Sequence, residues 1–153
     1  MNSLISRPRA VTSDTSANSK LSRRGLIYSY REGAARVSAA QSLEERSSEL
    51  AAGAVQSVLQ AHPEIAAYER LVASCARDIN FFIKLIISAL VYGSTQVLDD
   101  YLLIGMSEVY RALGLSMSCA INALLYIKHS HRLIEAEAQL TNEYIDYIIS
   151  GLS

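Results

Sequence analysis

The sequence predicts an all-α fold, and three observations support that prediction. Only 7 glycines and 2 prolines interrupt 153 residues, so long uninterrupted segments are expected. Apolar residues recur every three or four positions through most of the chain, which is the period of a helix. No segment of useful length shows the strict alternation that is typical of strands.

The first expected helical stretch runs from about residue 26 to residue 61. Gly33 is expected to break it, since glycine weakens a helix. The stretch ends before Pro63, because the residue that precedes a proline avoids the helical conformation. A second stretch follows at about 65–92 and ends at Gly93.

The C-terminal part is expected to contain four shorter helices. Asp99 and Asp100 have the charge that favours a helix N-terminus, so a short helix is expected to follow them. The other three are expected at about residues 107–113, 118–131 and 135–149.

Composition and charge limit the class of protein. Half of the residues are hydrophobic, which is enough for one domain with a buried core. The net charge of -1 argues against a nucleic-acid binder, because such proteins usually carry a basic excess. Residues 1–24 hold five basic side chains against one acidic. They are interpreted as a polar arm, partly disordered or docking a partner, that precedes one domain at 25–153.

Membrane and redox features are also informative. The most apolar run, residues 81–92, contains Lys84 and is shorter than the about 20 residues that a membrane span needs. The two cysteines, Cys75 and Cys119, do not form a disulfide framework, and they suit a reducing compartment.

Cys75 and Asp78 form the most informative motif of the chain. A separation of three puts both side chains on one face of a helix, one turn apart. The thiol can then hold a ligand covalently while the carboxylate accepts hydrogen bonds from the same ligand. The simpler interpretation is that Cys75 is a small buried side chain. Arg77, between them, is expected to favour the thiolate by its charge.

Five segments carry a resemblance to a known family. They are residues 75–79 (CARDI), 98–102 (LDDYL), 108–114 (EVYRALG), 123–128 (ALLYIK) and 144–153 (YIDYIISGLS). In this order and spacing, the chain resembles a phycobiliprotein subunit. Residues 30–36 (YREGAAR) also fall in register, so the resemblance covers nearly the whole chain. It is most like the phycocyanin α subunit, with an allophycocyanin-type subunit as second choice.

The resemblance implies a globin-like helical fold and a covalently bound open-chain tetrapyrrole, or bilin. Cys75 is implied as the attachment site through a thioether, and Asp78 as the acceptor for the pyrrole nitrogens. Arg77 and Lys84 are implied as partners of the bilin propionates, and Tyr101 as an aromatic neighbour of the rings. Ordinary packing is the alternative for Tyr101. Phycocyanobilin is the first candidate pigment, and phycoerythrobilin or another bilin is an alternative.

The resemblance also implies partners and a setting. A complementary phycobiliprotein subunit would form a heterodimer and then trimer or hexamer discs, with linker polypeptides and with a bilin lyase during maturation. The setting would be the phycobilisome on the cytoplasmic face of cyanobacterial thylakoids, or the plastid stroma. Nucleic acid and metal are not expected as partners. His129 and His131 are two positions apart and so point to different helix faces.

Three departures from the family pattern are visible. The segment between Pro63 and Cys75 is shorter than in the family and has no Asn, which many members use as a pigment contact. Cys119-Ala120 replaces a Trp-Tyr pair of phycocyanin α subunits. The polar N-terminal arm replaces a helical pair that docks the partner subunit.

Alternative functions stay open. A pigment-free scaffold or regulatory member of the same fold is favoured by the shortened segment. A globin-type haem sensor is more remote, since no His lies between Pro63 and Lys128. Cys119 is expected to be a core residue, with a second bilin anchor as the alternative. No enzyme is expected, because no constellation of catalytic groups emerges.

Overall fold

The computed structural model describes residues 31–153, and every regular element in that range is a helix. This confirms the all-α prediction. Residues 32–153 form one compact unit. The arm expected at residues 1–24 lies outside the described residues, so its separation from a domain at 25–153 stays a prediction. Within the described range, no helix combines the length and the apolar character of a membrane span.

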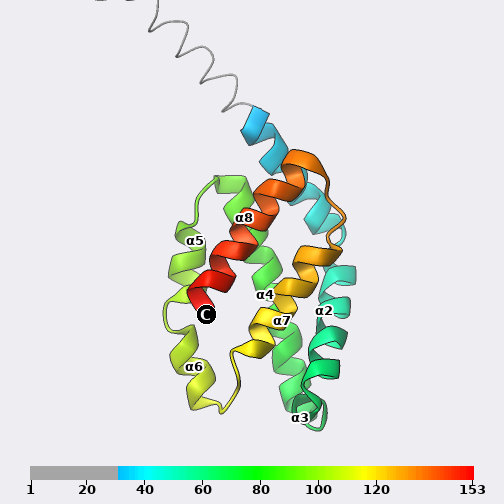
Figure 1. Cartoon of the computed structure of the whole chain (residues 1–153), viewed down its shortest axis with the longest axis vertical. Coiled ribbons are helices and arrows are strands. Elements are labelled where there is room, and N and C mark those ends of the chain that lie inside the picture. The colour runs from blue at the N-terminus through cyan, green and yellow to red at the C-terminus, as the bar shows by residue number, and fades with distance from the viewer. Residues whose placement is uncertain (1–30) are drawn as a thin grey trace, which may run out of the picture. The chain divides into compact units, whose positions relative to one another are not determined.

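Two long helices, α4 and α8, run through the unit with shorter ones around them (Figure 1). In chain order the helices are one at residues 31–45, α2 (Ser47–Ala61), α3 (Pro63–Ala66), α4 (Glu69–Tyr92), α5 (Gln96–Leu98), the π-helical turn η1 (Asp99–Leu103), α6 (Met106–Ala112), α7 (Ser118–Ser130) and α8 (Glu135–Leu152). Helix α4 packs against α2 and α8 and also contacts α5, so it occupies the middle of the fold.

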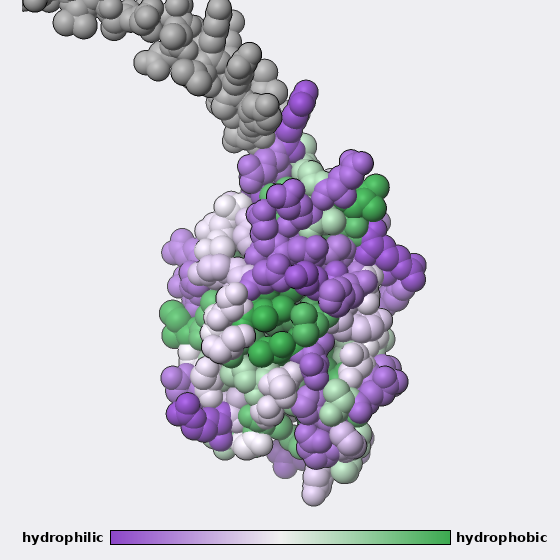
Figure 2. Space-filling view, in the orientation of Figure 1, coloured by the Kyte–Doolittle hydropathy of each residue, from purple (hydrophilic) through white to green (hydrophobic). Residues whose placement is uncertain are grey.

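The buried core is contributed mainly by α2, α4, α7 and α8. Its largest fully buried side chains include Phe82 and Leu90 of α4, Leu124 of α7 and Ile148 of α8. On the face that carries α7 and α8, Figure 2 shows an apolar area among mostly hydrophilic side chains. Exposed apolar areas of this kind are often contacts with other proteins.

The first helical stretch bends at Arg46, and the break expected at Gly33 is wrong. Gly33 lies inside the helix of residues 31–45. At Arg46 the backbone turns out of the helical conformation, yet Leu50 N–H still donates to the Arg46 carbonyl at 2.9 Å. The chain therefore changes direction while most of its hydrogen bonding continues.

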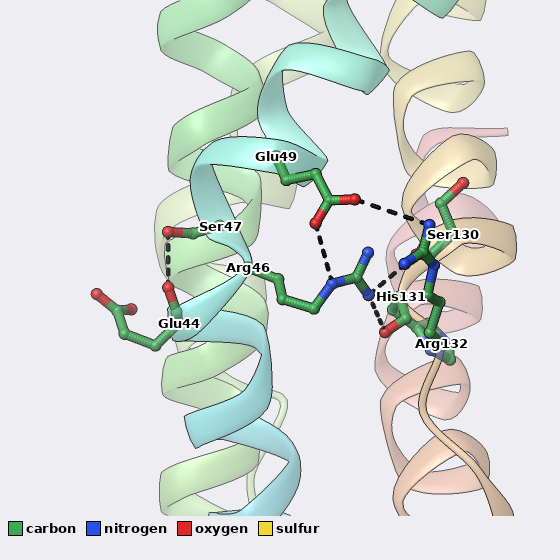
Figure 3. A network of polar contacts seen from close by, with 7 residues as sticks. All are labelled: Glu44, Arg46, Ser47, Glu49, Ser130, His131 and Arg132. Atoms are coloured by element: carbon green, nitrogen blue, oxygen red, sulfur yellow. Dashed lines mark hydrogen bonds and ion pairs between the residues drawn. The ribbon is translucent and has the colours of Figure 1, made fainter.

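The side chain of Arg46 explains why the bend falls there (Figure 3). Its guanidinium donates to the carbonyl oxygens of Ser130 and His131, at the C-terminal end of α7. It also pairs with Glu49, at 3.3 Å. The terminal carbonyls of a helix lack partners within the helix, so a cation is stabilising at this end. Arg46 thus joins three segments of the chain.

Two joints differ from the sequence-based expectation. The stretch expected at 65–92 is divided, because the chain leaves the helical conformation at Tyr68 between α3 and α4. Asp99 and Asp100 were expected to precede a short helix, but the helical segment already begins at Gln96. They therefore lie within it, where Asp99 accepts a hydrogen bond from Tyr147 of α8 at 2.6 Å.

Gly93 ends α4 as expected, and the structure adds a reason. Its φ of 65° is left-handed, a conformation that glycine adopts without strain. A side chain at this position would also overlap the guanidinium of Arg36. Arg36 donates to the Leu90 carbonyl at 3.2 Å, and so satisfies one of the last carbonyls of α4.

The α7–α8 turn depends on a buried histidine. His131 is 5% exposed, and its Nδ1 accepts a hydrogen bond from Leu133 N–H at 3.0 Å. Its Nε2 therefore carries the proton and donates to Asn142 at 2.9 Å. His129 is not part of this arrangement. Among residues 31–153, no group of three or more potential ligands is placed to hold a metal ion.

The close contact between α2 and α7 predicts that alanine in place of Gly53 destabilises the protein, although alanine favours a helix more than glycine does. A Cβ added to Gly53 would overlap the ring and hydroxyl of Tyr126. We expect Gly53→Ala to lower the free energy of unfolding by about 1–3 kcal/mol, because Tyr126 must move. Gly33→Ala is the matched control, since its nearest neighbour is the Arg36 guanidinium at 3.7 Å. It should raise stability by up to about 1 kcal/mol. If urea unfolding gives the same change in the free energy of unfolding for both variants, this account is contradicted.

Thr141 predicts a stabilising substitution. Its side chain is fully buried, and its hydroxyl has no hydrogen-bond partner among residues 31–153. Thr141→Val removes the hydroxyl and keeps the shape, so we expect the free energy of unfolding to rise by about 1 kcal/mol. Thr141→Ser, the control, keeps the hydroxyl and loses a methyl group, and it should be destabilising. A loss of stability in the valine variant, measured by thermal unfolding, would refute the interpretation.

Candidate functional site

Two hollows lie side by side along α4. The outer groove has a volume of about 350 Å³ and runs between α4 and the segment from η1 to the turn after α6. This volume is within the range of about 300–1,000 Å³ for small-molecule sites. The inner cavity has a volume of about 30 Å³ and lies between α4 and α7. That is about the space of one water molecule in the liquid.

A common wall separates the two hollows. The residues that line both of them are Ser74, Asp78, Phe82, Tyr110 and Leu115. Three of these come from α4, at spacings of four, because that spacing repeats along one helix face. Tyr110 comes from α6, and Leu115 from the turn that follows it. A ligand that reaches both hollows must therefore pass Asp78 and Tyr110.

Cys75 lines the inner cavity and is half-buried. The pKa of its thiol is raised from an ordinary 9.0 to about 11, first by burial and then by the charges of Cys119 and Asp78. Burial dominates because it disfavours the charged thiolate. The expectation that Arg77 favours the thiolate stays a prediction. The Arg77 guanidinium donates to the Ser74 hydroxyl, at 3.0 Å.

Asp78 is half-buried one turn further along α4. The Tyr110 hydroxyl donates to its Oδ2 at 3.3 Å. Burial raises the pKa of the Asp78 carboxyl, while the Tyr110 hydrogen bond and the Arg77 charge oppose that rise. The pKa of Tyr110 is also raised, by its own burial first and by the charge of Asp78 second. Neither hollow supplies a fully compensating positive charge to Asp78, so the site is poised to accept a cation or N–H donors.

The three remaining predicted site residues are placed differently from one another. Arg77 is exposed and lines the outer groove. Tyr101, in η1, also lines the groove and is 69% exposed. Lys84 is exposed but does not line the groove. It lies two helical turns beyond Arg77, about 10 Å further along α4. The structure therefore brings Cys75, Asp78, Arg77 and Tyr101 together, and Lys84 stays at the margin.

The shortened segment before Cys75 forms only part of the site. Ile65 of α3 and Leu71 of α4 line the inner cavity. No residue before Ser74, among those that the structure describes, lines the outer groove. The groove wall opposite α4 is formed instead by residues 101–115. Ile104, Val109 and Leu113 of that wall are each more than half exposed.

Sequence reasoning missed two features. Tyr110 lay inside a recognised segment, but nothing in that segment indicated that its hydroxyl meets Asp78. Cys119 is buried, which confirms its interpretation as a core residue. It also lines the inner cavity together with Cys75, and its thiol contributes to the raised pKa there. A pair of thiols at one cavity depends on how α4 packs on α7, which helical spacing alone does not reveal.

The arrangement suits a long, mostly apolar ligand with a reactive end. Apolar and aromatic side chains supply most of the groove, while Asp78 and Arg77 supply one carboxylate and one guanidinium. The thiol of Cys75 supplies a nucleophile once it is deprotonated. Within the described residues, these groups do not place a nucleophile beside a general base and a general acid. The arrangement therefore favours binding over catalysis.

Comparison with known proteins gives a family match over most of the chain. A model of the family described as "Phycobilisome protein" matches residues 22–152. The C-phycoerythrin alpha chain of Microchaete diplosiphon is 33% identical over 135 residues, which is 82% of each chain.

Two further relatives match over shorter lengths. The phycoerythrocyanin alpha chain of a Nostoc species is 36% identical over 91 residues, or 60% of this chain and 56% of the relative. The allophycocyanin beta chain of a Synechocystis species is 35% identical over 86 residues, which is 55% of this chain and 53% of the relative. The chain thus spans little more than half of these two relatives.

The raised pKa of Cys75 predicts how this thiol reacts. We expect the rate of its alkylation by iodoacetamide to rise with pH, with a midpoint at about 11, because only the thiolate reacts. Asp78→Asn should shift this profile to lower pH, since the carboxylate charge opposes ionisation of the thiol. Asp100→Asn, an exposed change outside both hollows, is the control and should leave the profile unchanged. Mass spectrometry of the Cys75 peptide gives the rate, and a midpoint near 9 in the unchanged protein would contradict the prediction.

Proposed function

This chain belongs to the phycobilisome protein family, and we propose that it is a light-harvesting subunit that carries one bilin bound to the sulfur of Cys75. The observation that carries the proposal is the position of Cys75 and Asp78 on adjacent turns of α4, where the inner cavity meets the outer groove. The proposed role is binding and orientation, without an enzymatic step.

The residues of the site are suited to such a pigment. The outer groove is mostly apolar, and the aromatic side chains of Tyr101 and Phe81 line it, which suits a conjugated molecule. The carboxylate of Asp78 accepts hydrogen bonds from N–H groups in the half-buried wall. Arg77, exposed in the groove, is suited to bind a propionate through its planar fork of donors. Lys84 can reach a second propionate only from the margin.

Attachment at Cys75 is a simple addition. The sulfur adds to a double bond in the ring A side chain of the pigment, so a carbon–sulfur bond forms and the thiol proton passes to the pigment. No electrons are gained or lost by the protein in this step. The bilin, once bound, supplies the absorption of visible light and the transfer of its energy. The protein holds it in one extended form, because packing and hydrogen bonds fix the groups around it.

The raised pKa of Cys75 supports a role for an assisting protein. At neutral pH a thiol with a pKa of about 11 is ionised about a hundred times less than one at 9.0. The thiolate is the nucleophile, so unassisted attachment should be slow. A bilin lyase that opens the inner cavity or deprotonates the sulfur would remove this barrier.

Assembly with other chains is part of the proposal. Exposed apolar side chains outside the outer groove include Val37, Val91, Tyr92, Leu125 and Ile134. Contiguous exposed apolar surface often marks a protein interface. A complementary phycobiliprotein subunit is the proposed partner, in heterodimers that build discs with linker polypeptides. The proposed location is a phycobilisome on the cytoplasmic face of thylakoids, or in a plastid stroma.

A pigment-free scaffold or regulatory member of the family is the second candidate. The observation that favours it is the absence, among the described residues, of any groove-lining residue before Ser74. A groove with a shorter wall holds a pigment less firmly. The two candidates differ in whether the purified protein from a bilin-making host is coloured.

The proposal predicts that Cys75 alone holds the pigment. When the chain is produced in a host that makes phycocyanobilin and a bilin lyase, we expect a band that stays fluorescent with zinc after denaturation. Cys75→Ser should abolish this band, because the thioether cannot form. Cys119→Ser removes the other thiol of the inner cavity and is the matched control, which should keep the band.

Three other outcomes would change the conclusion. A colourless protein from the producing host would replace the antenna role with the scaffold or regulatory role. A band that persists in Cys75→Ser would mean a different attachment site. Loss of the band only in Cys119→Ser would move attachment to that thiol.

A further inference from the structure

Among the described residues, Asp78 is the only carboxylate that lines either hollow, so the chemistry of the site depends on how it is held. Within residues 31–153 its one side-chain hydrogen bond runs from the Tyr110 hydroxyl to Oδ2. The described hydrogen bonds therefore leave Oδ1 free to accept N–H groups from a ligand.

Tyr110 reaches this carboxylate from a different element. It lies on α6, 32 positions beyond Asp78 in the sequence, and its side chain is 8% exposed. Its ring belongs to the wall between the two hollows. The ring therefore contributes packing, whereas the hydroxyl contributes a directional contact to one atom of Asp78.

We propose that Tyr110 is a positioning residue of the pigment site, whose hydroxyl fixes the Asp78 carboxylate so that Oδ1 faces the pyrrole N–H groups of a bound bilin. This inference rests on the proposed function. Tyr110 acts through Asp78, and the direct contact with the pigment remains that of Asp78.

The charge balance around Asp78 supports this role. Burial favours the neutral carboxyl, and the Tyr110 hydrogen bond opposes burial by stabilising the ionised form. The titratable groups that line the two hollows with Asp78, among the described residues, are Cys75 and Arg77 of α4, Tyr101 of η1, Tyr110 of α6 and Cys119 of α7. Arg77 is the only cation among them, and it is exposed and bonded to Ser74.

The Tyr110–Asp78 hydrogen bond is a long one. At 3.3 Å it is longer than the about 2.5–3.0 Å of a strong O–H···O bond. A hydrogen bond to an ionised carboxylate is stronger than one to a neutral group. A cationic pigment favours the ionised form of Asp78, which is the form that the Tyr110 hydroxyl stabilises.

The test uses two Tyr→Phe variants that each remove one Tyr–Asp hydrogen bond. Tyr110→Phe removes the bond to Asp78 and keeps the ring in the wall. Tyr147→Phe removes the 2.6 Å bond to Asp99, outside both hollows, and is the matched control. Both proteins are prepared without pigment and also loaded with phycocyanobilin.

Two measurements are made on each protein. In the pigment-free protein, carbon-13 NMR follows the titration of the Asp78 carboxyl. We expect its pKa to rise by about half a unit to one unit in Tyr110→Phe, because the ionised form loses a hydrogen bond. In the loaded protein, the pH at which the pigment loses its proton, read from the visible spectrum, should fall, because a carboxylate that Tyr110 no longer holds in place stabilises the positive charge of the pigment less well. Tyr147→Phe should change neither value.

The outcomes separate this inference from the proposed function. An unchanged Asp78 titration in Tyr110→Phe overturns the inference, and so does a changed titration with an unchanged pigment profile. A protein that takes up no phycocyanobilin even without substitution overturns the proposed function itself, and the inference with it. Equal shifts in both variants would show a general effect of losing a tyrosine hydroxyl and would also overturn the inference.

Discussion

The two faces of α4 impose the constraint on which the rest of the structure depends. One face is buried against α2 and α8, and the adjacent face forms the wall between the inner cavity and the outer groove. Because one helix serves both purposes, the site side chains cannot move without disturbing the core. Phe82 illustrates this coupling, since it is 2% exposed, belongs to the core and also lines both hollows. A rigid support of this kind is what holding a flexible conjugated molecule in one form requires.

Electrostatics and packing have different tasks in this site. The pigment-free chain disfavours both negative charges at the wall, because burial raises the pKa of Cys75 and of Asp78. In the proposed function, the positive charge of a protonated bilin favours the ionised form of Asp78, since opposite charges stabilise each other more strongly where water is partly excluded. Packing in the outer groove then sets how firmly the ligand is held.

Much of the fold follows from local sequence, and less of the site does. Pro63 and Gly93 mark the ends of long helices, because each restricts or permits backbone conformations that a helix does not use. The placement of Cys75 and Asp78 on one face follows from a spacing of three. The contact between Tyr110 and Asp78 joins residues 32 positions apart, and the bend at Arg46 depends on carbonyls 84 and 85 positions away. Such contacts come from tertiary packing, which periodicity does not encode.

The segment before Cys75 contributes less to the site than the opposite wall does. Among the described residues, that segment contributes Ile65 and Leu71 to the inner cavity and nothing to the outer groove. The opposite rim carries Ile104, Val109 and Leu113, which are 73%, 55% and 63% exposed. Covering apolar surface of this kind is favourable by about 25 cal/mol per Å², without any contribution from charge. In the proposed function, this rim supplies most of the apolar contact with the pigment, while Asp78 sets the orientation of the pigment and Cys75 prevents its departure.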